Sequence, residues 1–141
     1  MYDNLSPALY KAYLDTSYIV YTPQTEYTLK IGTMNQEWQE FLQGKSCHFY
    51  FFITAWNPYS IIQLDTDNEK SNLKLIYTIK ELQIEFFEGI GISSDQNWME
   101  KSICVLGGDL SLAYKLGNEF RQNAFVCGSF NQPPSLFITK K

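Results

Sequence analysis

Glu100 and Ser102 are the pair of side chains in this sequence best suited to chemistry. They lie in the segment Trp98-Met99-Glu100-Lys101-Ser102. Alternate residues of a strand point to the same face, so the carboxylate and the hydroxyl share a face and Lys101 points away. A carboxylate beside a hydroxyl can orient a ligand or act as a general base, although no second catalytic group follows at a recognisable spacing. Glu100 is therefore the expected general base if the protein is an enzyme, and otherwise a ligand-binding candidate with Ser102.

A second group of candidates lies where an apolar segment ends, in Thr54-Ala55-Trp56-Asn57-Pro58-Tyr59-Ser60. Ligand sites in sheets with helices often lie at such strand ends, which makes Trp56 and Asn57 binding candidates. The alternative is that Asn-Pro only forms the turn and that Trp56 caps the core.

A third group lies between a predicted helix and the strand that follows it. The segment Phe120-Arg121-Gln122-Asn123-Ala124 contains the only arginine of the chain and two amides. Arg121, Gln122 and Asn123 are binding candidates, but such groups also complete the last turn of a helix and complement its dipole. Asn68, at the start of another predicted helix, is the remaining candidate.

Glycines, cysteines and the single histidine give no catalytic or cofactor motif. The Gly89-Ile90-Gly91 segment is followed by Ser94 where a dinucleotide fingerprint needs a third glycine, so it predicts a bulge or tight turn. The three cysteines are widely spaced within apolar segments, which favours buried thiols in a reducing compartment. His48 lies in an aromatic strand and is expected to be a core or edge residue rather than a catalytic base. Without a Cys-x-x-Cys pair there is no zinc spacing, and no metal or cofactor is expected.

Charge and hydropathy exclude two classes of partner. The chain has 11 Lys and Arg residues against 15 Asp and Glu residues, and a net charge of -4. Because phosphate backbones and anionic membranes attract clustered basic residues, neither nucleic acid nor a membrane is an expected partner. The first residues do not follow a secretory pattern, and the apolar segments are too short to span a bilayer. We expect a cytoplasmic protein whose partner is an unidentified small molecule or another protein.

These candidates must be positioned by the helices and strands that hydrophobic periodicity predicts. The 141 residues are expected to form a single domain, 1–141. Expected helices are 6–14, 33–44, 68–82 and 109–120; expected strands are 18–21, 26–32, 47–56, 83–88, 101–106, 123–127 and a short 135–139. Asp65 or Asp67 is the expected N-cap of the third helix. The order is αββαβαββαβ with a short last strand, which indicates an α/β (α+β) fold, a single mixed β-sheet with helices packed on it.

The sequence resembles a bacterial family known as domain of unknown function 3293, over about residues 16–128. The blocks that carry the resemblance are FFITAWNPYS (51–60), the asparagine-led helix near Asn68, GIG (89–91), WMEKS (98–102), VLGGDLSLAYKLG (105–117) and FRQNAFV (120–126). The resemblance implies a single α/β-type domain and a helix over 68–82, and it implies no activity. The family usually has a basic residue where this chain has Ser71 and a glycine where it has Arg121. If the basic group binds an anion in the family, Arg121 could replace it here.

Three functions follow from these observations as alternatives. The first is a non-catalytic binding or regulatory domain with a polar pocket formed by Asn57, Asn68, Glu100, Gln122 and Asn123. The second is an enzyme acting on a small polar or nucleotide-like substrate, with Glu100 as the base and a perturbed pKa. The third is a protein–protein interaction module, which requires a contiguous exposed apolar patch.

Overall fold

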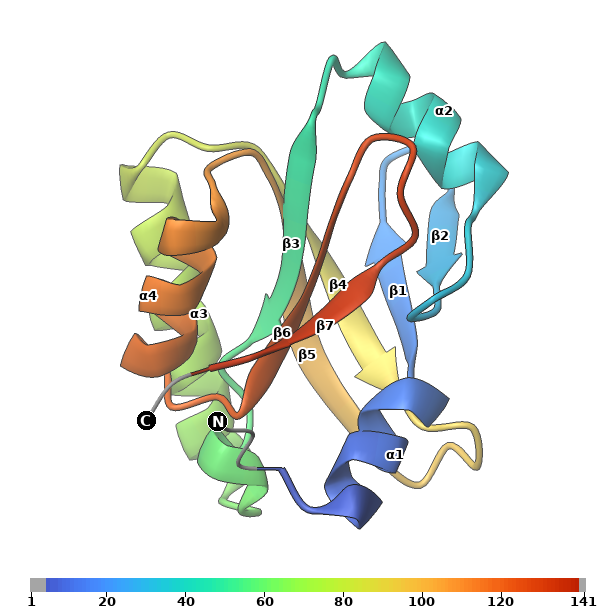
Figure 1. Cartoon of the computed structure of the whole chain (residues 1–141). Coiled ribbons are helices and arrows are strands. Elements are labelled where there is room, and N and C mark those ends of the chain that lie inside the picture. The colour runs from blue at the N-terminus through green and yellow to red at the C-terminus, as the bar shows by residue number, and fades with distance from the viewer. Residues whose placement is uncertain (1–4, 140–141) are drawn as a thin grey trace.

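The computed structural model describes residues 5–139, and within them it contains four α-helices and seven strands (Figure 1). The helices are α1 (Pro7–Asp15), α2 (Gln36–Gly44), α3 (Asp65–Glu81) and α4 (Leu110–Glu119), with a short 3-10 helix η1 (Pro58–Ser60) before α3. The strands are β1 (Ser17–Tyr21), β2 (Glu26–Leu29), β3 (Phe49–Thr54), β4 (Phe86–Ile92), β5 (Met99–Leu106), β6 (Ala124–Ser129) and β7 (Ser135–Ile138). The predicted order of elements and the α+β class are confirmed.

The strands form one sheet in the order β2-β1-β4-β5-β3-β6-β7. Every pair of neighbours in it is antiparallel, whereas a mixed sheet was predicted. The sheet curls into a half-barrel, and its two edges approach each other on the side of α2, where the Gly32 N–H donates to the Pro134 carbonyl at 2.8 Å. The inner, concave face of the sheet is therefore the face that α2 covers.

The outer face packs against α3 and α4, which both lie on the same side of the sheet in Figure 1. Phe51 and Ile53 of β3 point to this face and are buried with Leu75 and Ile79 of α3 and Leu116 of α4. The opposite set of β3 residues, Tyr50 and Phe52, belongs to the core of the inner face. This strand is therefore covered on both faces, as its apolar residues at successive positions indicate.

The inner face is filled at one end only. Trp38 and Leu42 of α2 are fully buried against Tyr50 and Leu106, and Trp38 meets Tyr50 edge to face with ring centroids 5.2 Å apart. At the opposite end of the same face, α1 crosses the sheet (Figure 1), and none of its residues is fully buried. None of the helices within residues 5–139 is long and apolar enough to cross a membrane.

Two local predictions were wrong. Gly89 and Gly91 lie inside β4 rather than in a turn that ends it, because β4 begins later than predicted, at Phe86, and extends to Ile92. The N-cap of α3 is Leu64, which makes no side-chain cap hydrogen bond, and the two predicted caps, Asp65 and Asp67, lie in the first turn. Carboxylates in a first turn still stabilise the helix by their charge.

Candidate functional site

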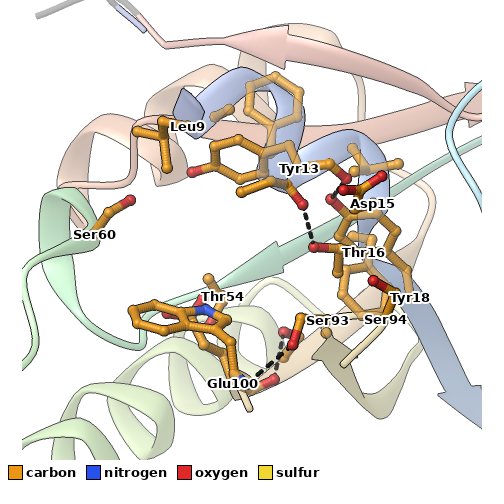
Figure 2. A pocket seen from close by; sticks show the side chains of 18 of the residues that line it. Leu9, Tyr13, Asp15, Thr16, Tyr18, Thr54, Ser60, Ser93, Ser94 and Glu100 are labelled. Atoms are coloured by element: carbon orange, nitrogen blue, oxygen red, sulfur yellow. Dashed lines mark hydrogen bonds between the residues drawn. The ribbon is translucent and has the colours of Figure 1, made fainter. Parts of the chain in front are cut away.

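A cavity of about 480 Å³ lies between α1 and the inner face of the sheet, at the end opposite α2 (Figure 2). It is lined by residues of α1, five strands, η1 and the β4–β5 turn: Leu9, Ala12, Tyr13, Asp15, Thr16, Tyr18, Phe52, Thr54, Ser60, Gly91, Ser93, Ser94, Asp95, Trp98, Glu100, Ser102, Ala124, Phe125 and Val126. This volume is in the range of small-molecule sites.

The polar wall of the cavity follows from the alternation of residues along β5. Leu106 and Cys104 belong to the inner core beneath α2, and Ser102 and Glu100 continue the same face into the cavity. Lys101 points to the outer side, where its Nζ lies 2.7 Å from the Glu69 carboxylate of α3. The predicted shared face of Glu100 and Ser102 is confirmed, and it changes from apolar to polar toward α1.

Of the two glycines in β4, Gly91 lines the cavity and leaves it free of a side chain at that point. Gly91 pairs with Tyr18 of β1 on one side and with Glu100 on the other, so no side chain separates these two across the wall. A Cβ at Gly91 would lie in ordinary contact, 3.5 Å from Thr16 Cγ2. At Gly89 a Cβ would collide with the backbone carbonyl oxygen of Ile19, so that position requires glycine.

Glu100 is partly buried at the cavity and is held by a buried amide. The Nδ2 of Asn57 donates to its carboxylate at 3.2 Å. Burial raises the pKa of Glu100 from 4.5 to about 7, although the hydrogen bonds from Asn57 and Trp98 act in the opposite direction. Near neutral pH this side chain is therefore present in both its acid and its ionised forms.

Asn57 is itself fixed by Asn68, which is only 1% exposed. Asn68 Oδ1 accepts from the Asn57 N–H at 2.8 Å, and Asn68 Nδ2 donates to Asn57 Oδ1 at 2.9 Å. Gln63 completes the network, since its N–H donates to Asn57 Oδ1 and its side chain to Asn68 Oδ1. The two amides thus orient the carboxylate from outside the cavity.

The turn after β3 has a strained backbone. Asn57, Tyr59 and Ser60 all have positive φ, of 46°, 54° and 63°, a region that costs energy for residues other than glycine. The Tyr59 N–H donates to the Arg121 carbonyl at 2.6 Å, and Asn123 Nδ2 donates to Ser60 Oγ at 3.0 Å. These bonds hold the Ser60 hydroxyl at the cavity.

Tyr13 of α1 forms the opposite wall, and in Figure 2 its ring lies across the cavity from Thr54 and Glu100. Burial raises the pKa of Tyr13 to about 12; the hydrogen bond with Ser60 lowers it and the charge of Glu100 raises it further. The phenol therefore keeps its proton at neutral pH and can serve as a donor.

The structure brings some of the predicted site residues together and leaves others apart. Glu100 and Ser102 line the cavity, and Asn57, Asn68 and Asn123 lie behind its wall, linked to it by hydrogen bonds. The other predicted residues do not line it.

Trp56 is buried, and its carbonyl accepts from Gln122 Nε2 at 3.2 Å, so this pair ties two turns together. Arg121 is exposed and has a φ of 55°, and Ser71 lies in α3; neither lines the cavity. The positions at which the chain differs from the family pattern are thus separate from this candidate site.

Sequence reasoning missed Tyr13, Ser60 and Trp98. Ser60 and Trp98 lie inside segments that were singled out, and continuing the strand alternation from Ser102 through Glu100 reaches Trp98. Tyr13 had no such signal, because its place depends on how α1 packs across the sheet.

The thiols and the histidine offer no second site of similar quality. Cys47, Cys104 and Cys127 are all buried, as predicted, and burial raises the pKa of each thiol. His48 is exposed beside Cys47 at a smaller cavity of about 230 Å³. Within residues 5–139 no group of three or more His, Cys, Asp or Glu residues could hold a metal ion.

Comparison with known proteins identifies a family for this chain. Residues 53–125, just over half of the chain, match the model of a family described as protein of unknown function (DUF3293). The match includes the network of Asn57, Asn68 and Glu100 and excludes α1. No match was found among curated proteins or among solved structures. The chain therefore belongs to the DUF3293 family, as the resemblance of its sequence blocks implied.

Proposed function

We propose that this protein is a non-catalytic binding or regulatory domain that holds a small molecule in the cavity beneath α1. The observation that carries the proposal is the cavity itself, about 480 Å³ in volume, with an apolar floor and a polar wall oriented by buried amides. A few fixed polar groups in a largely apolar concavity are typical of ligand sites.

The test is to fill the cavity from its glycine wall. A Leu side chain at Gly91 would project into the cavity. Gly44 on α2 serves as the matched control, because a Cβ added there would have no neighbouring atom within 4 Å. Native mass spectrometry of freshly purified protein should show a bound small molecule in the wild type and in Gly44→Leu, and its loss in Gly91→Leu. An equal occupancy in both variants would contradict the proposal.

A second candidate is an enzyme that acts on a small polar or nucleotide-like substrate. The observation that favours it is that Glu100 faces the cavity with its pKa raised to about 7 by burial, which suits a general base at neutral pH. Asn57 would orient the carboxylate. If the protein is an enzyme, Glu100→Gln should still bind the molecule but should no longer convert it. If the protein is a binding domain, neither the wild type nor Glu100→Gln converts the bound molecule.

An interaction module is the third expectation, and one observation favours it. Ile61, Ile62 and Leu64, which are 69%, 75% and 71% exposed, lie in the segment between η1 and α3. Replacing all three with serine should abolish self-association or partner binding in analytical ultracentrifugation if this segment is an interface, and should leave the cavity ligand in place.

A further inference from the structure

We infer that the cavity takes a small organic cation, an amine with an apolar body, whose ammonium group donates hydrogen bonds to the Glu100 carboxylate. This inference rests on the proposed binding function and names its ligand class. Three independent features of the lining support it: its charge, its surplus of hydrogen-bond acceptors and its aromatic floor.

The charge of the lining is of one sign. Asp15, Asp95 and Glu100 line the cavity, and no Lys, Arg or His does so among the described residues. Two lysines of neighbouring segments make other contacts: Lys101 pairs with Glu69 on the outer face, and Lys30 Nζ donates to the Asp15 main-chain carbonyl at 3.2 Å. An anionic ligand would therefore enter a site with three carboxylates and no counter-ion, which is unfavourable.

Five of the hydroxyl groups that line the cavity are committed as donors within the protein. Thr54 Oγ1 donates to the Lys101 carbonyl at 2.6 Å, Ser102 Oγ to the Glu100 carbonyl at 3.2 Å, and the Tyr18 hydroxyl to the Tyr13 carbonyl at 2.8 Å.

Two further hydroxyls follow the same pattern, since Thr16 donates to the Ala12 carbonyl at 2.7 Å and Ser93 donates to the Asp95 carboxylate at 2.7 Å. A hydroxyl has one proton, so these five groups can offer a ligand only their lone pairs. A ligand that contacts these five groups must supply the donors, and an ammonium group supplies three and accepts none.

The rest of the cavity suits an apolar body. Phe52, Tyr18 and Val126 line its floor on the sheet, and Trp98 and Leu9 line it from the β4–β5 turn and α1. Aromatic faces also attract cations, which adds to the preference for an amine over a neutral alcohol of the same shape.

The experiment uses three probes with the same indole body: tryptamine, tryptophol and indole-3-propanoate, which are a cation, a neutral alcohol and an anion at pH 8. Each is titrated into ¹⁵N-labelled protein, and the amide shifts of Gly91, Ser102 and Thr54 report binding in the cavity. We expect tryptamine to bind at least about tenfold more tightly than indole-3-propanoate, as a partly buried charge pair permits.

Glu100→Gln removes the charge and keeps the shape. In this variant the preference for tryptamine over tryptophol should fall to about threefold or less. The matched control is Glu26→Gln, because Glu26 is exposed on β2 and does not line the cavity, and it should keep the wild-type preference.

The pH dependence gives a second readout. With the pKa of Glu100 near 7, tryptamine affinity should rise about tenfold between pH 6 and pH 8 in the wild type and stay flat in Glu100→Gln. The other groups that face Glu100 do not explain such a rise. Burial keeps Tyr13 of α1 protonated with its pKa raised, and the Ser93 and Asn97 hydrogen bonds lower the pKa of Asp95 in the β4–β5 turn. Asp15 at the end of α1 also lines the cavity, and Lys101 pairs with Glu69 on the outer face; all three residues are common to the wild type and Glu100→Gln.

The outcomes separate this inference from the function on which it rests. If tryptophol or indole-3-propanoate shifts the cavity amides more strongly than tryptamine, the ligand class is wrong and the binding function stands. If none of the probes shifts these amides and the purified protein carries no ligand, both are wrong. Equal tryptamine binding by the wild type and Glu100→Gln overturns the assigned role of the carboxylate.

Discussion

Substituting Glu100 with glutamine should stabilise the protein at neutral and alkaline pH. The unfolded chain releases the Glu100 proton near pH 4.5, whereas in the folded chain burial raises its pKa to about 7. Between these values the folded state binds more protons than the unfolded state, so the free energy of unfolding falls as pH rises. At ~1.4 kcal/mol per pH unit, the ionised side chain lowers that free energy by about 3 kcal/mol at pH 8.

Urea denaturation of the wild type and Glu100→Gln from pH 4.5 to 8.5 measures this directly, because the difference between the two cancels the other titrating groups. The glutamine Oε1 can still accept the hydrogen bond from Asn57 Nδ2, so the variant keeps the local geometry. The stability difference should be near zero at pH 4.5 and reach about 3 kcal/mol in favour of the variant by pH 8. A difference independent of pH would refute the reasoning. Glu26→Gln, the exposed control, should stay within ~0.5 kcal/mol of wild type.

Three further predictions concern the residues around Glu100. Asn68→Ala should lower the free energy of unfolding by about 2–3 kcal/mol in urea denaturation, because it leaves the buried Asn57 N–H without an acceptor. Gly89→Ala should cost more than ~2 kcal/mol by the same measurement, since its Cβ meets the Ile19 backbone, whereas Gly91→Ala should stay within ~1 kcal/mol. A double-mutant cycle on the Lys101–Glu69 pair should give a coupling free energy below ~1 kcal/mol, because ion pairs exposed to solvent are weak. A larger value would contradict this expectation.

The sequence predicted those elements whose pattern depends only on their own side chains. Trp38, Phe41 and Leu42 recur at helical spacing and form the apolar face of α2, and the apolar residues of β3 predicted a strand covered on both faces. Gly89 and Gly91 were assigned to a turn because glycine most often marks one. What places them in a strand is the pairing of β4 with β1 and β5, which no local window contains.

The candidate site likewise has one part that the local sequence pattern predicts and another part that depends on tertiary contacts. The common face of Glu100 and Ser102 follows from strand alternation and could be predicted. The link from Glu100 to Asn57 and Asn68 joins β5 to the turn after β3 and the start of α3, and it depends on tertiary contacts. Tyr13 could not be found, because whether a residue of an amphipathic helix faces a cavity or a core depends on what lies opposite it.

Several features that lower stability occur around the same cavity. Gly91 leaves a space where a larger side chain would increase apolar burial, the left-handed residues Asn57 and Ser60 strain the turn, and Glu100 carries a carboxylate whose ionisation burial disfavours. A sequence selected for stability alone would replace each of them, because cavity filling and removal of buried charge both stabilise proteins. Elsewhere the inner face is packed with Trp38, Tyr50 and other large side chains. Function is expected where several features that lower stability occur together. The occurrence of all three features around one cavity, rather than any single residue, supports a ligand-binding role for it.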